Sequence, residues 1–297
     1  MAKAANPVLR RLGLSGNDRA LVIQAAEVGM CHATLPAFSE VMAFGLVTSG
    51  SLMVPSPWFP QAAALCRDHP GWDVGVHATV TSEWLSCRWR PLSTLDPDTG
   101  LVDEDGYLPR QAADVRERAE PDPLYAEIKV QITRALAAGI DVTHLDQHMF
   151  AFSDPRTFPP YAEAAVRFHV PPILLRSGDY ARRGVSLETA RVLEGWGSEM
   201  EELGWPVFDS VQELPLRDPE GQVAITRKMI DGLGPGLHLI VLHPAIDTPE
   251  LRAMVPNWQA RVANREAMLS VGLRDHVRLS GVRLIGFREL RRAAGKK

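Results

Sequence analysis

The sequence predicts an α/β protein folded as a single (β/α) barrel, an irregular TIM-like barrel of seven or eight strands. Short β-rich apolar runs alternate with amphipathic segments along most of the chain, which is typical of βαβ units in a parallel sheet. The run Leu237–Leu242 is almost continuously apolar, as expected of a strand covered on both faces. No low-complexity linker or shift in composition divides the 297 residues, which favours one barrel over two domains.

Each expected element rests on a local pattern. In the segment 31–44, Leu35, Phe38 and Val41 recur at helical spacing, and Gly139 ends a helix whose apolar residues show the same spacing. The expected strands are Ala20–Ala25, Leu46–Val54, Trp72–Val80, Val142–Leu145, Pro172–Arg176, Pro206–Asp209, Leu237–Leu242 and Val282–Phe287. The expected helices are Cys31–Phe44, Pro57–Arg67, Tyr125–Ala138, Pro159–Phe168, Leu187–Leu203, Val223–Leu233, Trp258–Gly272 and a basic terminal helix.

Three segments follow from this pattern. Residues 1–19 form an N-terminal extension, and residues 20–297 form the barrel domain. Residues 82–122 are the least regular stretch, rich in proline and glycine. Because a loop of this length in a compact domain is usually functional, we expect it to be a lid insertion over the site.

Composition narrows the class of protein. The formal net charge is −4, which gives no support to a sequence-independent nucleic-acid binder. The three cysteines show no CxxC spacing, which favours a reducing compartment. No stretch approaches the roughly 18 to 20 apolar residues of a membrane helix, and residues 1–15 lack the apolar region of a secretory signal. We therefore expect a cytoplasmic globular protein.

Candidate functional residues follow four of the expected strands. Glu27 comes after the first strand, His77 lies at the third, Asp146 and His148 follow the fourth, and His243 follows the long apolar strand. The carboxyl ends of strands in a parallel barrel meet on one face, so these side chains can come together. One carboxylate and two imidazoles there would form an open three-ligand metal site. A structural histidine, or a glutamate favoured by a helix dipole, is the ordinary alternative for each residue alone.

The motifs, in their order, resemble those of the YdjC-like (ChbG/HpnK-type) carbohydrate deacetylase family. The matching segments are Ala25–Gly29, Gly75–His77, Thr143–Phe150, Leu242–Pro244, Gly45–Val54 and Gly281–Leu290, and the resemblance spans roughly residues 20 to 290. It implies a (β/α) barrel that removes the N-acetyl group from an amino sugar with one divalent metal ion. It also implies that Glu27, His77 and His148 hold that ion.

The departures from the family motifs concern the reaction. The family's general base, the first aspartate of a paired motif, maps to Ala26, which cannot accept a proton. Two explanations stay open: an engineered change that would trap a substrate, which the otherwise regular motif favours, and a natural variant with another base or without hydrolysis. Phe150 and Gln147 replace a histidine and a serine of the family pattern.

The remaining roles follow from the chemistry of amide hydrolysis. We expect His243 to act as the acid that protonates the departing amine. Asp146 would accept a hydrogen bond from a ligand imidazole. Arg176 would orient a substrate oxygen or carboxylate, although a surface ion pair is an equally good account of it. Trp84, Trp89 and Trp258 are candidates for stacking on a sugar, or simply core residues.

We therefore expect a metal-dependent carbohydrate N-deacetylase, an amide hydrolase that acts on C–N bonds other than peptide bonds. The ligand set favours Zn²⁺, with Mg²⁺ or another divalent ion as the alternative. The expected partner is a small-molecule N-acetylated sugar, with no nucleic acid and no membrane, and a homodimer stays open. Two other hypotheses compete: a catalytically silent carbohydrate-binding barrel, and a deacylase of a non-sugar amide.

Overall fold

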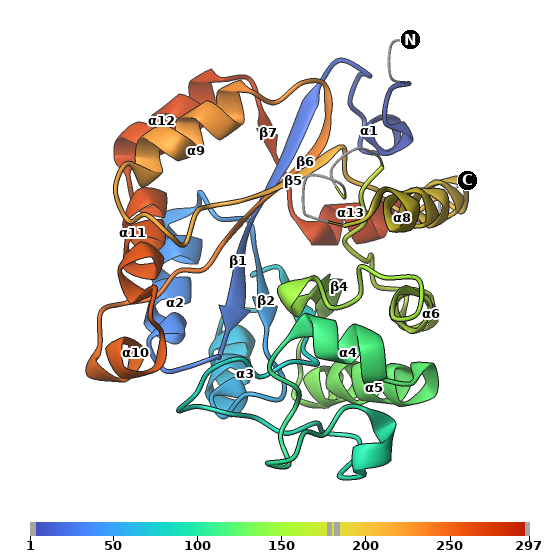
Figure 1. The fold of residues 1–297 in the computed structure, drawn as a ribbon. Coiled ribbons are helices and arrows are strands. Elements are labelled where there is room, and N and C mark those ends of the chain that lie inside the picture. Colours follow the sequence, from blue (N-terminus) through green and yellow to red (C-terminus); the bar gives the residue numbers. More distant parts are fainter. Residues whose placement is uncertain (1–3, 177–179, 181–184, 295–297) are drawn as a thin grey trace.

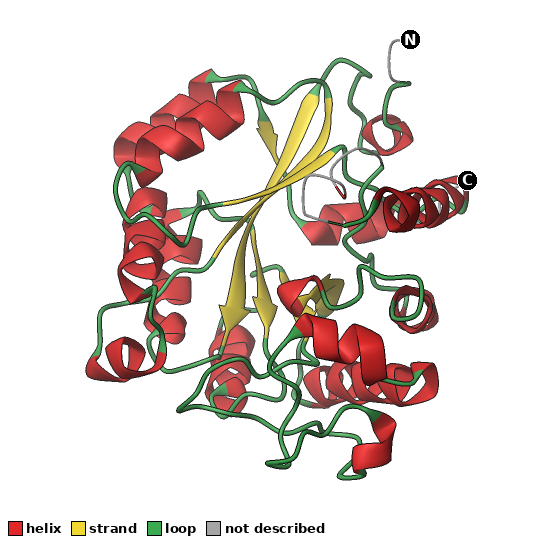
Figure 2. Ribbon diagram, viewed as in Figure 1, coloured by secondary structure: helices red, strands yellow, loops and turns green. Residues whose placement is uncertain are grey.

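The strands of the protein form one parallel sheet at its centre (Figures 1 and 2). The structure, a computed structural model, describes residues 4–176, 180 and 185–294. Its strands are β1 (Arg19–Val28), β2 (Ser49–Leu52), β3 (Val74–Ala78), β4 (Val142–Gln147), β5 (Ser210–Glu213), β6 (Gly236–Leu242) and β7 (Arg283–Leu284). The hydrogen-bonded order is β4-β3-β2-β1-β6-β5, and β7 pairs with the amino end of β1.

The segment Pro172–Leu175 connects the two edges of this sheet. Leu145 of β4 pairs with Pro172, and Leu175 pairs with Phe208, just before β5. The backbone N–H of Phe208 donates to the carbonyl of Leu174 at 2.7 Å, and that of Ile173 donates to Leu145 at 3.1 Å. These bridges carry the sheet around from β4 to β5, so the expected (β/α) barrel-like fold is confirmed.

Helices surround the strands (Figure 2). They are α1 (Pro7–Arg11), α2 (Thr34–Phe44), α3 (Phe59–Asp68), α4 (Ala112–Arg118), α5 (Pro121–Ala137), α6 (Phe158–Phe168), α8 (Leu187–Glu202), α9 (Gln222–Asp231), α10 (Pro249–Met254), α11 (Trp258–Met268), α12 (Val271–Leu279) and α13 (Phe287–Ala293). Among the described residues, no helix combines the length and apolar character needed to cross a membrane.

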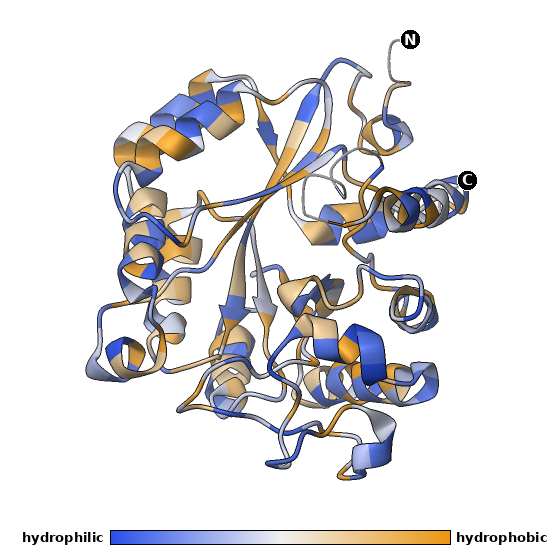
Figure 3. Cartoon of the chain, in the orientation of Figure 1, coloured by the Kyte–Doolittle hydropathy of each residue, from blue (hydrophilic) through white to orange (hydrophobic). Residues whose placement is uncertain are grey.

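The apolar core lies between the strands and the inner faces of these helices. The outer helices, such as α9 and α12, carry both hydrophilic and hydrophobic patches, as expected of helices with one solvated face (Figure 3). Within α1, Val8 and Leu9 are fully buried, and the helix contacts α13 and β6. The segment expected as an N-terminal extension therefore packs on the barrel from residue 6 onward.

Three expected elements differ most from the structure. The expected strand Pro172–Arg176 consists of two isolated bridges, and the expected strand Pro206–Asp209 begins later, at Ser210. The expected helix Trp258–Gly272 is interrupted, because the Ser270 side chain accepts a hydrogen bond from the Leu273 N–H and begins α12 as its N-cap. The hydrophobic periodicity continues through this break, so the sequence pattern did not predict where one helix ends and the next begins.

The segment 82–122 holds a short 3-10 turn at Pro97–Thr99, helix α4 and the start of α5. Trp89 is buried, and its Nε1 donates to the carbonyl of Thr81 at 2.7 Å. Most of the segment between Thr81 and Pro109 is irregular, but side-chain and backbone hydrogen bonds connect its ends. The segment is therefore a folded insertion that leaves the barrel at the carboxyl end of β3.

Candidate metal and active site

Three strands deliver one ligand-type side chain each to the same point. Glu27 lies at the end of β1, His77 in β3, and His148 directly after β4. All three are buried, and one potential ligand atom from each lies within 4.8 Å of the other two. The convergence of carboxyl ends in a parallel barrel brings together residues that are up to 121 positions apart in the chain.

A bulge in β1 turns Glu27 toward this point. The pairing of β1 with β2 shifts between Ala25 and Val28, so that β1 holds one residue more than its partner. Glu27 takes up this extra residue with a φ of 59°, in the left-handed region that residues with a side chain rarely adopt. Such a conformation costs about 1–3 kcal/mol and is typical of functional sites.

His77 is oriented by a buried carboxylate. Its Nδ1 lies 2.8 Å from Asp146 Oδ2, and Gln24 Nε2 donates to the same oxygen at 2.6 Å. Burial would raise the pKa of Asp146, but the charge of His77 and its hydrogen bond outweigh burial and lower it. A carboxylate behind Nδ1 keeps a proton on that nitrogen, so the lone pair of Nε2 faces the cluster.

His148 has the opposite arrangement of its two nitrogens. Its Nε2 lies 3.0 Å from Glu83 Oε2, while its Nδ1 lies 3.2 Å from His77 Nε2 and 3.6 Å from Glu27 Oε1. Burial would lower the pKa of His148, but the neighbouring Glu83 and Glu27 carboxylates raise it. Met149 and Phe150, which follow, both have positive φ, 53° and 51°, and form the tight turn that presents His148.

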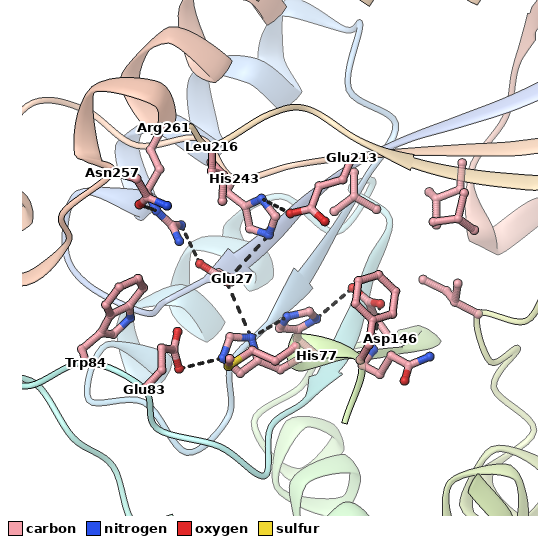
Figure 4. Close-up of a pocket in the computed structure, with 18 residues that line it drawn as sticks. Glu27, His77, Glu83, Trp84, Asp146, Glu213, Leu216, His243, Asn257 and Arg261 are labelled. Carbon is pink, nitrogen blue, oxygen red and sulfur yellow. Dashed lines mark hydrogen bonds and ion pairs between the residues drawn. The ribbon is translucent and has the colours of Figure 1, made fainter. Parts of the chain in front are cut away.

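Arg261 holds the second oxygen of Glu27. Its Nη1 lies 2.5 Å from Glu27 Oε2, and its Nε donates to Asn257 Oδ1 at 3.2 Å (Figure 4). The guanidinium is buried beside Trp84, with Cζ 5.7 Å from the ring centroid. Burial alone would raise the pKa of Glu27, but Arg261 and then the three neighbouring histidines hold it well below its usual range. Glu27 is therefore a carboxylate with Oε1 free to bind a cation.

His243 stands on the other side of Glu27, at the end of β6. Its Nε2 lies 3.7 Å from Glu27 Oε1, and its Nδ1 lies 3.6 Å from Glu213 Oε1 of β5. Both separations exceed hydrogen-bond distance, while the His243 backbone N–H is fixed by Asn264 Oδ1 at 3.1 Å. Burial lowers the pKa of His243, and the Glu27 and Glu213 carboxylates offset this only in part.

The spacing of the donor atoms fits a metal ion. Donors at about 2.0–2.1 Å from a tetrahedral ion lie roughly 3.4 Å from one another. Two of the three separations, 3.2 Å between the two histidines and 3.6 Å between His148 and Glu27, are close to that edge, and the third pair lies within 4.8 Å. One carboxylate oxygen and two imidazole nitrogens, each backed by a charged partner, form an open site of the catalytic type. This buried group of three residues can hold a divalent ion.

A cavity of about 340 Å³ opens over the cluster. Its charged wall holds Glu83, Glu213 and Arg261, and Figure 4 shows these side chains around Glu27. Its apolar wall holds residues of β5, β6 and neighbouring loops, among them Val211, Leu239, Val241, Leu216 and Ile173. The volume lies within the roughly 300–1,000 Å³ of small-molecule sites.

The other residues expected at the site have different surroundings. Ala26 is buried directly before Glu27, with 1% of its surface exposed. Arg176 is absent from the cavity wall, because its guanidinium binds Glu201 at 2.8 Å and Asp209 at 3.2 Å near the amino end of β5. In this structure Arg176 therefore forms an ion pair, the alternative that the sequence left open, and its contact with substrate stays a prediction.

The three tryptophans considered for stacking divide in the same way. Trp84 lines the cavity. Trp89 is buried within the segment 82–122, and Trp258 packs against the Arg252 guanidinium, with Cζ 4.6 Å from its ring centroid. Of the three, only Trp84 is among the residues that line this cavity, together with Glu83 from the same segment.

Sequence reasoning missed Glu83, Glu213 and Arg261. A signal existed for Arg261: it lies with Ala260, Asn264 and Ala267 on the buried face of α11, where an arginine needs a partner. Glu83 belongs to an irregular segment without periodicity, and Glu213 to a strand of four residues that the sequence pattern placed too early. No local pattern distinguished these two from solvated carboxylates.

Comparisons with known proteins agree with this geometry. The family described as YdjC-like protein matches residues 20–278. The carbohydrate deacetylase of Thermus thermophilus is 34% identical over 266 residues, which cover 88% of this chain and 90% of that protein. The chitooligosaccharide deacetylase of an Enterobacter species is 26% identical over 278 residues, 92% of this chain and all of the relative.

The fold has a close match among solved structures. A protein of Enterococcus faecalis V583 named for cellobiose-phosphate cleavage superposes with a TM-score of 0.76 at 22% identity, covering 92% of this chain and 99% of that one. At this identity the likeness concerns the fold alone. The family match over most of the barrel, the order of its motifs and the extended similarity to a curated relative together show that the chain belongs to the YdjC-like family.

Proposed function

We propose that this protein is a metal-dependent hydrolase that removes the N-acetyl group from an amino sugar or oligosaccharide. The observation that carries the proposal is the buried cluster of Glu27, His77 and His148 at the carboxyl ends of the strands, facing a cavity of about 340 Å³. The names of the related proteins, carbohydrate deacetylase and chitooligosaccharide deacetylase, support an N-acetylated sugar as the substrate.

Glu27, His77 and His148 would hold one divalent ion, with Zn²⁺ favoured by the two imidazoles and Mg²⁺ as the alternative. When bound, such an ion polarises an amide carbonyl and acidifies a water molecule. Asp146 keeps His77 in the tautomer that a ligand needs, and Arg261 leaves Glu27 a single free oxygen. His243, which faces the cluster from β6, is the expected acid for the departing amine nitrogen; because burial lowers its pKa, it must take up a proton before it can donate one.

Ala26 stands where the family has its general base, so this chain lacks a proton acceptor at that position. General-base assistance typically contributes about 10²- to 10⁴-fold to the rate. We expect the protein to bind metal and sugar but to hydrolyse slowly. The same residue favours the second candidate function, a catalytically silent carbohydrate-binding barrel.

The experiment compares the protein with its Ala26→Asp form at matched zinc content. Amine release is measured from N-acetylated sugars and, in parallel, from other acylated amines. We expect Ala26→Asp to increase turnover of a sugar by about 10²- to 10⁴-fold with nearly unchanged zinc binding. Full activity of the Ala26 protein would show that its base lies elsewhere. Inactivity of both forms toward every sugar would favour the silent carbohydrate-binding barrel. Activity only on other acylated amines would favour the non-sugar deacylase.

A further inference from the structure

Glu83 connects the segment after β3 to the proposed metal site. Its side chain is 12% exposed, and its Oε2 lies 3.0 Å from His148 Nε2. Two of the residues that line the cavity, Glu83 and Trp84, come from the segment 82–122. Of these two, Glu83 contacts a ligand-type histidine, His148. Nothing in the family motifs or in the reaction described above assigns it a role.

The contact selects one tautomer of His148. With Nε2 directed at a carboxylate, the ring carries its proton there and leaves the lone pair of Nδ1 for the cluster, where His77 Nε2 lies 3.2 Å and Glu27 Oε1 3.6 Å away. Asp146 has the mirror-image effect on His77, through Nδ1. Each histidine ligand thus has a carboxylate on its far side, an arrangement that fixes ring orientation and increases metal affinity.

The position of Glu83 depends in turn on the fold of its own segment. The Ser82 N–H donates to the carbonyl of Pro109 at 2.8 Å, and Ser82 Oγ accepts from the Trp89 N–H at 2.9 Å. Trp89 Nε1 donates to the carbonyl of Thr81 at 2.7 Å. Thr81 and Ser82, directly before Glu83, are therefore held by hydrogen bonds to Trp89 and Pro109 further along the segment.

We propose that Glu83 is the positioning residue that couples this segment to the metal site: it holds His148 ready to bind the ion, and ion binding in turn stabilises the fold of residues 81–109. The reciprocity follows from linkage, because an interaction that favours metal binding is favoured by it to the same extent. The inference rests on the proposed function, since it requires a divalent ion at Glu27, His77 and His148.

The first test measures Zn²⁺ affinity of the full chain by competition with a chelator. Glu83→Leu removes the acceptor, and we expect the affinity to fall by about 10- to 100-fold, the usual range for such partners. Glu83→Gln keeps an uncharged acceptor, and we expect a fall of about three- to tenfold. Glu213→Gln is the matched control: it removes a carboxylate from the same cavity, beside His243, and is expected to change the affinity by less than about threefold.

The second test separates positioning from general stability. In the zinc-loaded protein, nitrogen-15 shifts of the His148 ring should show the proton on Nε2, and amide hydrogen exchange in residues 81–109 should be slower than without zinc. In Glu83→Leu we expect zinc to leave the exchange of this segment unchanged. If Glu83→Leu does not fold, Glu83→Gln decides, with a smaller protection by zinc than in the unaltered protein.

Three results overturn the proposal, and they differ in what else they affect. If the unaltered protein binds zinc and both Glu83 variants bind it equally well, the coupling is wrong while the metal site stands. If the unaltered protein binds no divalent ion, the metal-dependent function fails, and the coupling fails with it. Equal losses in Glu83→Gln and Glu213→Gln would likewise refute a specific role, because they would indicate only a general effect of charge.

Discussion

One buried histidine lies in the first half of β4 and another directly after the strand, and their surroundings are opposite. At the amino end, His144 stacks on Phe287 with ring centroids 3.7 Å apart, and its Nε2 has no hydrogen-bond partner among the described residues. Burial lowers its pKa to about 3. At the carboxyl end, the carboxylates of Glu83 and Glu27 raise the pKa of His148 in spite of burial.

Two aspartates show the same contrast. Asp73, before β3, accepts hydrogen bonds from the Thr143 hydroxyl and from the Arg288 N–H, yet burial raises its pKa. Asp146, near the carboxyl end of β4, faces His77. Burial would raise its pKa, but His77 lowers it. Burial alone therefore does not distinguish the site residues from the others. Asp73 and His144 lie away from the cavity, whereas Asp146 and His148 line it beside charged partners.

The largest expected effect comes from removing His148, with removal of His144 as its control. His148→Leu should lower zinc affinity by more than about 100-fold, because it removes a ligand and not merely an outer partner. His144→Leu, a change of the same kind four positions earlier, should leave zinc affinity within about threefold. Titration calorimetry on both variants checks the pair, and similar losses in the two would contradict the division of β4.

A smaller effect is expected from the aspartates. Asp146→Asn keeps the shape but removes the charge behind His77, and we expect zinc affinity to fall by about 10- to 100-fold. Asp73→Asn alters the closed network at the other end and should cost stability without this loss. Chelator competition and urea unfolding on both variants separate the two outcomes. A loss of zinc affinity in Asp73→Asn would contradict the contrast between the two aspartates.

The smallest effect concerns acid stability. His144 has a pKa of about 3 when folded, against about 6.5 in an unfolded chain, so below about pH 6.5 the unfolded state binds the additional proton. Its contribution to stability is complete above that pH and decreases as pH falls toward 3, by roughly 2 kcal/mol at pH 5. Unfolding free energies at pH 8 and 5 should therefore differ less in His144→Leu than in the unaltered protein. An identical pH dependence would show that His144 does not contribute.

Much of the barrel could be predicted from the sequence because its strands are apolar and its helices periodic. The order of β1, β3, β4 and β6 and the residues at their ends followed from that pattern, and Glu27, His77 and His148 do lie together. The segment Pro172–Arg176 was harder to predict. Its apolar residues suggest a strand, but the segment forms two isolated bridges and no regular ladder.

The rest of the site could not be predicted, since it depends on distance in space rather than on pattern. Arg176 follows an expected strand as His243 does, but its neighbours Glu201 and Asp209 come from other elements and hold it away from the cavity wall. Glu83 reaches His148 from an irregular segment whose path no periodicity describes. These charged residues acquire their roles from partners that the sequence places 25 to 65 positions away.

The turn after His148 has a consequence for attempts to make this protein more robust. Met149 and Phe150 hold positive φ angles of 53° and 51° without being glycine, each at about 1–3 kcal/mol. Glycine at either position would relieve the strain but would also free the hinge that aims the His148 ring. A search that selects only for melting temperature would be drawn to these two positions and would trade the fixed orientation of His148 for stability.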